Sequence, residues 1–253
     1  EIEFYKFKND KKFNPEKINF YSIKSSKKIC DLKISDFNTE YCKYTTLTRS
    51  DFINFLKKDL ESLIKTNYSI SNIDHKNQKI KLTFENNEIF ECDYLIVSDG
   101  VFSKSKNLIS ENQNQPRYNN TLAIRGIMPY SSKIDCKNIS LFLGPDFHQV
   151  IYPVNSNGDL NFIAIMKYNL SRSEQKNYSL FRDKNFIKSI IDNVPSEIKE
   201  LFDEIKEIKI YPVFVNNNFF KVKNNNIHLI GDAFFAFPPS FAQGASQSIE
   251  GAY

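Results

Sequence analysis

The spacing of apolar residues along the chain changes from a strand period to a helix period and back. An alternation of apolar and polar residues predicts short strands near the start, at residues 2–7, 18–23 and 28–32. From Phe52 to Ile64 the apolar residues recur every three or four positions, which predicts a helix with one buried face. Thr48 and Asp51 have the spacing of a capping box, so this helix should begin near Thr48 and end near residues 65–67.

Strand patterns dominate the rest of the chain. They fall at residues 68–73, 79–84, 89–97, 122–128, 139–143, 149–154, 160–166, 208–215 and 227–230. Asn86-Asn87 and Asn157-Gly158 predict hairpin turns, because Asn and Gly adopt the positive φ angles that tight turns require. Helices are predicted at 181–191 and at 196–202, the second with Pro195 at its start, and a last helix opens at Gln243-Gly244.

Two apolar strands run directly into a turn that contains Asp and Gly. Tyr94–Val97 is followed by Ser98-Asp99-Gly100, and Ile227–Ile230 is followed by Gly231-Asp232. Such an ending is typical of the carboxyl end of a parallel strand, where open α/β sheets bind ligands. An Asp in that place can accept hydrogen bonds from ribose or ribitol hydroxyls, and a neighbouring Gly lets the backbone approach a ligand closely.

The composition is that of a globular protein. The 253 residues are 41% hydrophobic and 25% charged, which is enough to bury a sizeable core. The net charge of +4 is interleaved along the chain, which argues against a nucleic-acid partner. There is no apolar run of membrane-spanning length, no signal-peptide pattern and no metal-ligand spacing among the four cysteines. We therefore predict a cytoplasmic protein without a metal site or an integral membrane segment.

Glycine is scarce. The chain has 7 glycines, none of them in the first 99 residues, whereas an average protein has roughly 7% glycine. Neither a G-x-G-x-x-G loop nor a Walker phosphate loop is present. A nucleotide site in this protein must therefore lack the usual glycine loop or have lost it from this sequence.

Two segments together resemble the flavin-dependent aromatic hydroxylases. Residues 231–245 read GDAFFAFPPSFAQGA and resemble the family's second FAD motif, G-D-A-A-H-x-x-x-P-x-x-x-Q-G. Residues 99–106 read DGVFSKSK and resemble the family's D-G-x-x-S-x-x-R motif. Arg49, with Phe52 in the Leu position, resembles the R-x-x-L segment that touches FAD in the family.

The resemblance covers nearly the whole chain in the same order. Residues 123–126, 143–148 and 152–154 are similar to segments of salicylate-hydroxylase-like members. Three residues depart from the family. Phe235 replaces the motif His, and Lys106 replaces the motif Arg. The acidic pair that usually follows the second motif is Glu250-Gly251 here, so glycine replaces its second acidic residue. The family's N-terminal strand–GxGxxG–helix unit and its C-terminal helical region have no counterpart here. Our hypothesis is that the chain is an internal fragment.

The resemblance implies a mixed α/β fold in two domains. Residues 1–117 and 205–253 would form a Rossmann-like, three-layer FAD-binding domain that is truncated at both ends. Residues 118–204 would form an inserted, mostly antiparallel β-sheet domain with helices that covers the substrate.

The implied activity is that of a monooxygenase. FAD reduced by NADH or NADPH would react with O₂, and the resulting flavin hydroperoxide would hydroxylate a phenolic or aromatic-acid substrate. Because the cofactor carries this chemistry, no catalytic side chain is expected. The fragment alone should bind FAD poorly and be inactive, and a homodimer is one assembly that we expect of the complete protein.

The resemblance also implies roles for individual residues. The expected FAD-binding residues are Arg49, Asp99, Gly231, Asp232, Gly244 and Ala245. Pro238 and Pro239 would form a rigid wall beside the flavin and the substrate, and Phe237 would line the same pocket. Arg125 is either a strand-edge ion pair or an anchor for a substrate carboxylate, and His148 is expected to be structural.

Two other functions are compatible with the sequence. One is a related flavoprotein of different chemistry, such as a ubiquinone-pathway hydroxylase, a halogenase or a reductase. The other is a non-catalytic, degenerate homologue that keeps the fold without flavin, which Phe235 and the missing glycine loop favour slightly. Flavin absorbance of the full-length protein would separate the second from the rest.

Overall fold

The computed structural model describes residues 3–76, 79–109, 115–130, 134–216 and 224–253. The chain divides into two compact units. The first contains residues 1–62 and 120–212, and the second contains residues 63–119 and 213–253.

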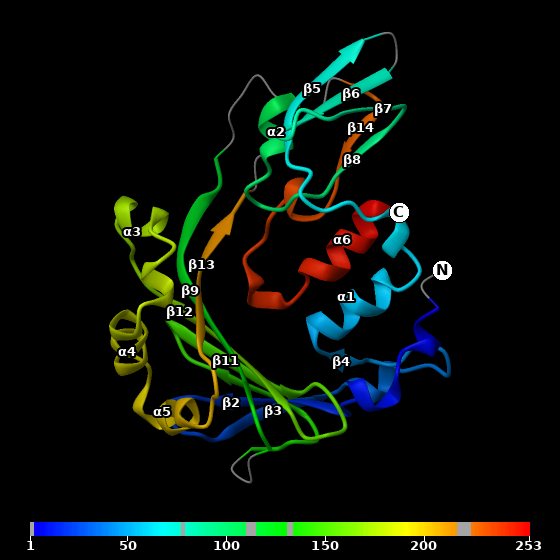
Figure 1. Ribbon diagram of the computed structural model, residues 1–253. Coiled ribbons are helices and arrows are strands. Elements are labelled where there is room, and N and C mark those ends of the chain that lie inside the picture. The colour runs from blue at the N-terminus through cyan, green and yellow to red at the C-terminus, as the bar shows by residue number, and fades with distance from the viewer. Residues whose placement is uncertain (1–2, 77–78, 110–114, 131–133, 217–223) are drawn as a thin grey trace. The chain divides into compact units, whose positions relative to one another are not determined.

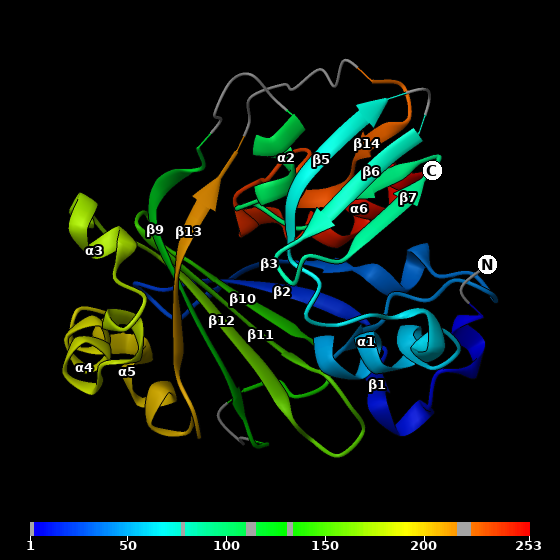
Figure 2. The same ribbon diagram turned by 45° about the horizontal axis from the view of Figure 1, so that its top comes forward.

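A seven-stranded sheet dominates the first unit. Its strands, in spatial order, are β13 (Lys209–Val215), β9 (Arg117–Met128), β12 (Leu160–Lys167), β11 (Phe147–Pro153), β10 (Ile139–Leu143), β2 (Lys17–Ser22) and β3 (Lys28–Lys33). The pairs β9–β12, β12–β11, β11–β10 and β2–β3 are antiparallel, and β10–β2 is parallel (Figure 2). A separate antiparallel pair joins β1 (Lys12–Phe13) to β4 (Thr46–Leu47).

The two faces of this sheet differ in burial. In β11 the buried and half-buried residues alternate strictly, with Phe147 and Ile151 among the buried ones. Helices α3 (Arg172–Lys176), α4 (Lys184–Asp192) and α5 (Ser196–Asp203) come between β12 and β13 in sequence and lie beside β9 and β12 (Figure 1). The ring of Phe202 in α5 meets the ring of Phe162 in β12 edge-on, with the centroids 4.9 Å apart. One face therefore packs on α5, and we call it the helix-covered face.

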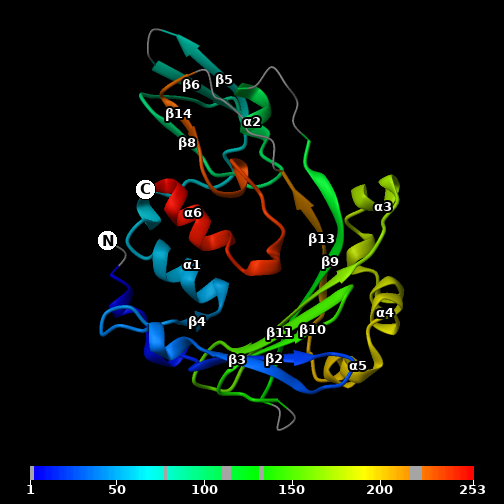
Figure 3. The ribbon, with the colours of Figure 1, turned by 180° about the vertical axis from the view of Figure 1, so that it is seen from behind.

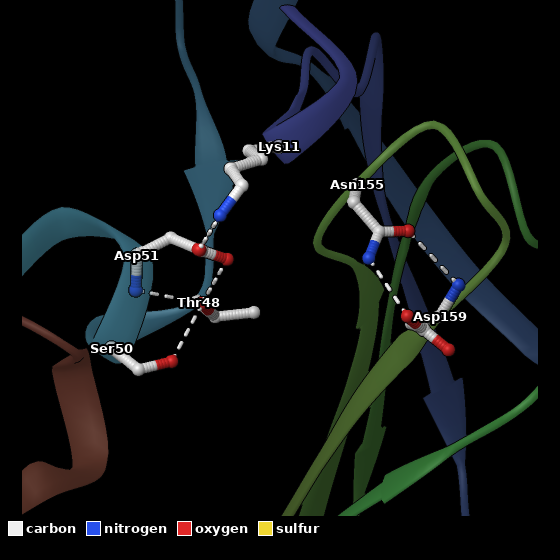
Figure 4. A network of polar contacts seen from close by, with 6 residues as sticks. All are labelled: Lys11, Thr48, Ser50, Asp51, Asn155 and Asp159. Carbon is white, nitrogen blue, oxygen red and sulfur yellow. Dashed lines mark hydrogen bonds and ion pairs between the residues drawn. The ribbon is translucent and has the colours of Figure 1, made fainter. Parts of the chain in front are cut away.

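Helix α1 (Arg49–Lys57) begins where the sequence predicts. The Thr48 side chain accepts a hydrogen bond from the Asp51 N–H, and Lys11 forms an ion pair with the Asp51 carboxylate (Figure 4). The predicted end near residues 65–67 is wrong, because α1 stops at Lys57 and only a short 3₁₀ turn follows at Glu61–Leu63. The apolar residues beyond Lys57 are exposed, so no packing stabilises further helical turns.

The second unit holds two smaller sheets. β5 (Ile70–Lys76), β6 (Lys79–Phe84) and β7 (Ile89–Cys92) form an antiparallel sheet, and β8 (Leu95–Val97) pairs in parallel with β14 (Ile227–Leu229) (Figure 3). The helices of this unit are α2 (Lys104–Ile109) and α6 (Gly244–Ala252). The core is formed by Ile80, Leu82, Val97, Ile227 and Ala233. Among the described residues of the chain, no helix is long and apolar enough to cross a membrane.

Most predicted elements are confirmed, with two further differences. The predicted strand at residues 2–7 is wrong, because Phe4–Lys6 forms a 3₁₀ turn. The rings of Phe4 in this turn and of Phe7 after it pack on Phe55 of α1. The predicted strand at 89–97 is two strands, β7 and β8, which belong to different sheets. Asn87 and Gly158 have positive φ angles in the predicted hairpin turns.

The compact units have other boundaries than the domains that the sequence predicts. β2 and β3 extend the large sheet through the parallel pairing of β2 with β10, so residues 1–62 share a unit with residues 120–212. The division into FAD-binding and substrate-covering parts is a functional one, and it stays a prediction.

Gly126 provides a test of the packing on the helix-covered face. A Cβ atom at this position would overlap Ile205 Cγ2 and would lie 3.2 Å from the carbonyl oxygen of Glu207. We expect Gly126→Ala to lower the free energy of unfolding by about 1–3 kcal/mol, measured by urea denaturation.

The control is a double-mutant cycle with Ile205→Ala, which removes the overlapping methyl group. In that background the same glycine substitution should cost much less. Equal costs in both backgrounds would show that overlap with Ile205 is not the cause.

Candidate functional site

The two Asp-Gly turns lie at the same edge of a sheet. β8 and β14 are parallel and in register, with Leu95 opposite Ile227 and Val97 opposite Leu229. The Ile230 N–H continues this pairing with a 3.0 Å hydrogen bond to the Val97 carbonyl oxygen. The turns that follow the two strands are therefore neighbours within the second unit, as the sequence predicts for the carboxyl ends of parallel strands.

The turn after β14 closes tightly around Gly231. Residues 231–233 form a 3₁₀ turn, and the Gly231 carbonyl accepts hydrogen bonds of 2.9 Å from the N–H groups of both Phe234 and Phe235. Gly231 has a φ of +57°, and a Cβ atom there would lie 3.0 Å from Ser248 Oγ in α6. Glycine thus lets the turn approach α6, while Asp232 beside it remains exposed.

The turn after β8 is fixed by its own side chains. Asp99 Oδ2 accepts a 3.1 Å hydrogen bond from the Ser105 N–H, and Ser103 Oγ accepts a 2.9 Å bond from the Lys106 N–H. These bonds satisfy two N–H groups in the first turn of α2, which have no acceptor within the helix. The Asp99 carboxylate therefore positions α2, and its residue stays exposed at the sheet edge.

Lys106 connects the two turns. Its residue is 2% exposed, and Lys106 Nζ lies 3.4 Å from the Phe234 carbonyl oxygen, to which it donates a hydrogen bond. Burial lowers the pKa of Lys106 below the ordinary lysine value. The lysine keeps the positive charge of the family's Arg but not the guanidinium fork. The sequence alone reveals that Lys106 replaces the family's Arg. It does not reveal that Lys106 is buried, because that burial arises from tertiary contacts.

The residues between the turn and α6 form an aromatic and proline segment. The Phe235 and Phe237 rings have centroids 4.5 Å apart, and an isolated bridge pairs Ala236 with Asn216. Pro238 is exposed, and Pro239 opens a 3₁₀ turn that ends at Ala242, a non-glycine residue with a φ of +52°. Phe235 places a half-buried ring where the family has a histidine, so no ring nitrogen is available there.

The structure brings together only some of the predicted site residues. Asp99, Gly231, Asp232, Gly244 and Ala245 all lie in the second unit. Arg49 is the first residue of α1, is exposed and belongs to the first unit, so its role at an FAD site stays a prediction.

Arg125 lies on β9 of the first unit. Its guanidinium carbon lies 5.9 Å from the centroid of the Tyr211 ring. No carboxylate of the described residues forms an ion pair with it, so the ion-pair interpretation of Arg125 is not supported. His148 on β11 is half-buried, and burial lowers its pKa, which keeps the imidazole neutral at pH 7 and agrees with a structural role.

The second unit has the features that a dinucleotide such as FAD requires. A Cβ atom added at Gly100 or Gly244 would meet no atom within 4 Å, so both backbones are open to a ligand. The first hydrogen bond within α6 is made by the Gln247 N–H, which leaves the preceding N–H groups, including those of Gly244 and Ala245, without an intrahelical acceptor. Such groups suit a phosphate or another anion, and the exposed Asp99 and Asp232 suit hydroxyls. The residues therefore fit FAD.

Comparison with known proteins also indicates that the chain binds FAD. The family model described as "FAD binding domain" matches residues 19–253. Salicylate hydroxylase of Pseudomonas putida is 22% identical over 239 residues, which cover 83% of this chain and 52% of that protein. The 6-hydroxynicotinate 3-monooxygenase of Bordetella bronchiseptica is 21% identical over 217 residues, covering 83% of this chain and 55% of that protein.

Solved structures share the fold. The complex of Klebsiella pneumoniae HpxO with FAD and uric acid has a TM-score of 0.82 at 14% identity and covers 96% of this chain and 64% of that one. A salicylate hydroxylase substrate complex has a TM-score of 0.73 at 18% identity and covers 94% and 63%. This chain spans about half the length of the curated relatives that it matches. Because the family model matches nearly the whole chain, the protein belongs to the FAD binding domain family.

Proposed function

We propose that the complete protein is an FAD-dependent monooxygenase that hydroxylates a small aromatic substrate with NADH or NADPH and O₂. The observation that carries this proposal is the pair of Asp-Gly turns at one edge of the parallel β8–β14 sheet. Membership of the FAD binding domain family supports the cofactor. The names of the relatives, among them salicylate hydroxylase, support the reaction class.

The chain's own residues would hold the cofactor in the following way. Asp232, exposed beside the Gly231 turn, accepts hydrogen bonds from ribitol hydroxyls, and Asp99 lies at the neighbouring turn where cofactor and nicotinamide meet. The N–H groups of Gly244 and Ala245 at the start of α6 donate to the pyrophosphate or to the flavin ring. Arg49 is also expected to bind FAD, a role that rests on its resemblance to the family's R-x-x-L segment.

Bound FAD, reduced by NAD(P)H, supplies the activation of O₂, and the protein supplies orientation and an environment without water. Pro238 and Pro239 provide a rigid wall, because proline fixes φ and presents no N–H group. Phe237 adds an exposed apolar ring to the same segment. This chemistry requires no nucleophilic side chain from the protein.

We assign the remaining parts by function. Residues 1–117 and 205–253 bind FAD, and residues 118–204 carry the sheet that covers the substrate, with Arg125 as an anchor for it. Arg125 forms no ion pair with a carboxylate of the described residues, which supports this role. Assembly as a homodimer and a cytoplasmic location stay predictions, which light scattering and fractionation would test.

Turnover by the complete, FAD-loaded protein tests the reaction. We expect NAD(P)H oxidation to rise in the presence of one or more phenolic or aromatic acids and to yield a hydroxylated product, detected by mass spectrometry with ¹⁸O₂. Peroxide should be measured in parallel, because NAD(P)H oxidation that yields only peroxide is not hydroxylation. A well-folded, complete protein that stays colourless with added FAD would exclude the proposal.

Asp232→Ala tests the cofactor site without turnover. A hydrogen bond to a charged group contributes about 1.5–3 kcal/mol, so the Kd for FAD should rise roughly 10- to 100-fold. The measurement is titration of flavin fluorescence in the complete protein. Asp93→Ala is the matched control, since Asp93 is an exposed Asp in the same unit whose ion pair with Lys79 is also exposed, and it should leave the Kd unchanged. Equal effects of both substitutions would remove Asp232 from the FAD site.

A further inference from the structure

The positive charge of Arg49 lies where the helix itself disfavours a cation. Arg49 is the first residue of α1 and is exposed. The start of a helix carries a partial positive charge, which favours an anion there and disfavours a cation. Within the part of the chain that the structure describes, Arg49 forms no ion pair. The charge of Arg49 therefore does not serve the stability of α1.

A carboxylate close to Arg49 in sequence is neutralised by a residue 40 positions earlier in the chain. Asp51 Oδ1 forms a 2.5 Å ion pair with Lys11 Nζ, and Asp51 Oδ2 accepts a 2.7 Å hydrogen bond from the Thr48 hydroxyl (Figure 4). Both oxygens of the carboxylate thus have partners other than Arg49. Because Lys11 and Asp51 together carry no net charge, the charge of Arg49 remains at the start of α1.

Both charges of this pair persist at neutral pH. The hydrogen bond from Lys11 lowers the pKa of the Asp51 carboxyl below its ordinary value, and the same bond raises the pKa of Lys11. An unpaired aspartate is also ionised at pH 7, because its ordinary pKa is about 3.9. Loss of Lys11 would therefore leave a negative charge at the start of α1, two positions from Arg49.

That negative charge would act on any anionic ligand of Arg49. Residues two positions apart on a helix do not face each other, so Asp51 is poorly placed to pair with Arg49 itself. An anion bound at the start of α1 would be attracted by Arg49 and repelled by Asp51, and the two effects would largely cancel. Neutralisation of Asp51 is what leaves a net positive charge at this helix end.

Backbone contacts hold Lys11 in its place. Lys11 ends the 3₁₀ turn Asn9–Lys11, and the next two residues pair with β4, which ends just before α1. The carbonyl oxygen of Asp10 accepts a 3.2 Å hydrogen bond from the Ser156 N–H in the turn between β11 and β12. These bonds bring Lys11 to the start of α1 independently of its ion pair, so a substitution of the Lys11 side chain should leave the local fold intact.

We propose that Lys11 is a positioning residue for the cofactor, which neutralises the Asp51 carboxylate and so keeps the start of α1 positive for the phosphate groups of FAD. The role rests on the proposed function, because it takes FAD as the ligand of Arg49. The phosphates are the groups of FAD that are anionic at neutral pH, so they are the groups on which this charge acts. Lys11 acts through Asp51 and not by contact with the cofactor.

Two substitutions that change the charge in opposite directions test this role. The Kd for FAD is measured in the complete protein by titration of flavin fluorescence at low ionic strength. Lys11→Gln leaves Asp51 charged, so the Kd should rise about 3- to 10-fold. Asp51→Asn breaks the same ion pair but removes the negative charge, so the Kd should stay unchanged or fall. The double variant has the wild-type net charge, and its Kd should lie within about twofold of the wild-type value.

Further variants and salt separate charge from structure. Lys11→Arg keeps the charge and should keep the wild-type Kd. Lys33→Gln is the matched control, because Lys33 is an exposed lysine of the same unit that pairs with Asp36, and it should leave the Kd unchanged. In about 0.5 M salt the effect of Lys11→Gln should shrink to about twofold or less, because salt screens charges at the surface.

A purely structural role of the ion pair predicts a different pattern. Lys11→Gln and Asp51→Asn would then weaken FAD binding by similar factors, at low and at high salt, and this result would overturn the proposal. An unchanged Kd in Lys11→Gln at low ionic strength would overturn it as well. Thermal unfolding of both single variants, measured in parallel, should show similar melting temperatures, since both lose the same ion pair.

The outcome is separable from that of the proposed function. A protein whose FAD affinity follows the expected charge pattern but which forms no hydroxylated product keeps the role of Lys11 and loses the proposed activity. A protein that hydroxylates aromatic compounds and binds FAD equally well with Lys11→Gln keeps the activity and loses the role of Lys11. A complete, folded protein that does not bind FAD excludes both.

Discussion

The parallel pairing of β8 with β14 is the constraint on which the candidate FAD site depends. Each strand has only three residues, and an antiparallel arrangement would place the two Asp-Gly turns about 10 Å apart at opposite ends. So short a pair is not stable by hydrogen bonds alone. Val97 and Ile227 from the two strands pack with Ile80, Leu82 and Ala233, so burial of these side chains holds the register that the polar turns exploit.

A second layer of contacts fixes the turns themselves. Asp99 and Ser103 satisfy the first N–H groups of α2, and Lys106 in that helix donates to the Phe234 carbonyl of the other turn. Each half of the site thereby positions the other. A lysine is sufficient for this link because the acceptor is a single carbonyl oxygen, for which the guanidinium fork of an arginine is not needed. The departure from the family motif at Lys106 is therefore compatible with the family's geometry.

The sequence predicted the parts of this structure that depend on local signals. The apolar runs before the Asp-Gly turns identified β8 and β14 as parallel strands, and the Thr48–Asp51 spacing located the start of α1. The sequence did not locate the end of α1. Apolar residues keep their helical spacing beyond Lys57, but they are exposed and pack on nothing that would extend the helix. The sequence also did not give the pairing of β2 with β10, since residues such as Ile18 and Ile139 come together only through tertiary contacts. The burial of Lys106 likewise depends on tertiary contacts, among them the one with the Phe234 carbonyl oxygen.

The glycines differ in whether the packing of the chain requires them. At Gly126 and Gly231 a side chain would meet Ile205 or Ser248, so the chain's own packing requires glycine. Gly244 is different, because a Cβ atom there would meet nothing within 4 Å and its φ angle is not positive. Alanine would stabilise the helix by up to about 1 kcal/mol relative to glycine. Nothing within the described residues requires glycine at this helix start, which agrees with the proposal that the phosphate of a bound cofactor approaches the backbone there.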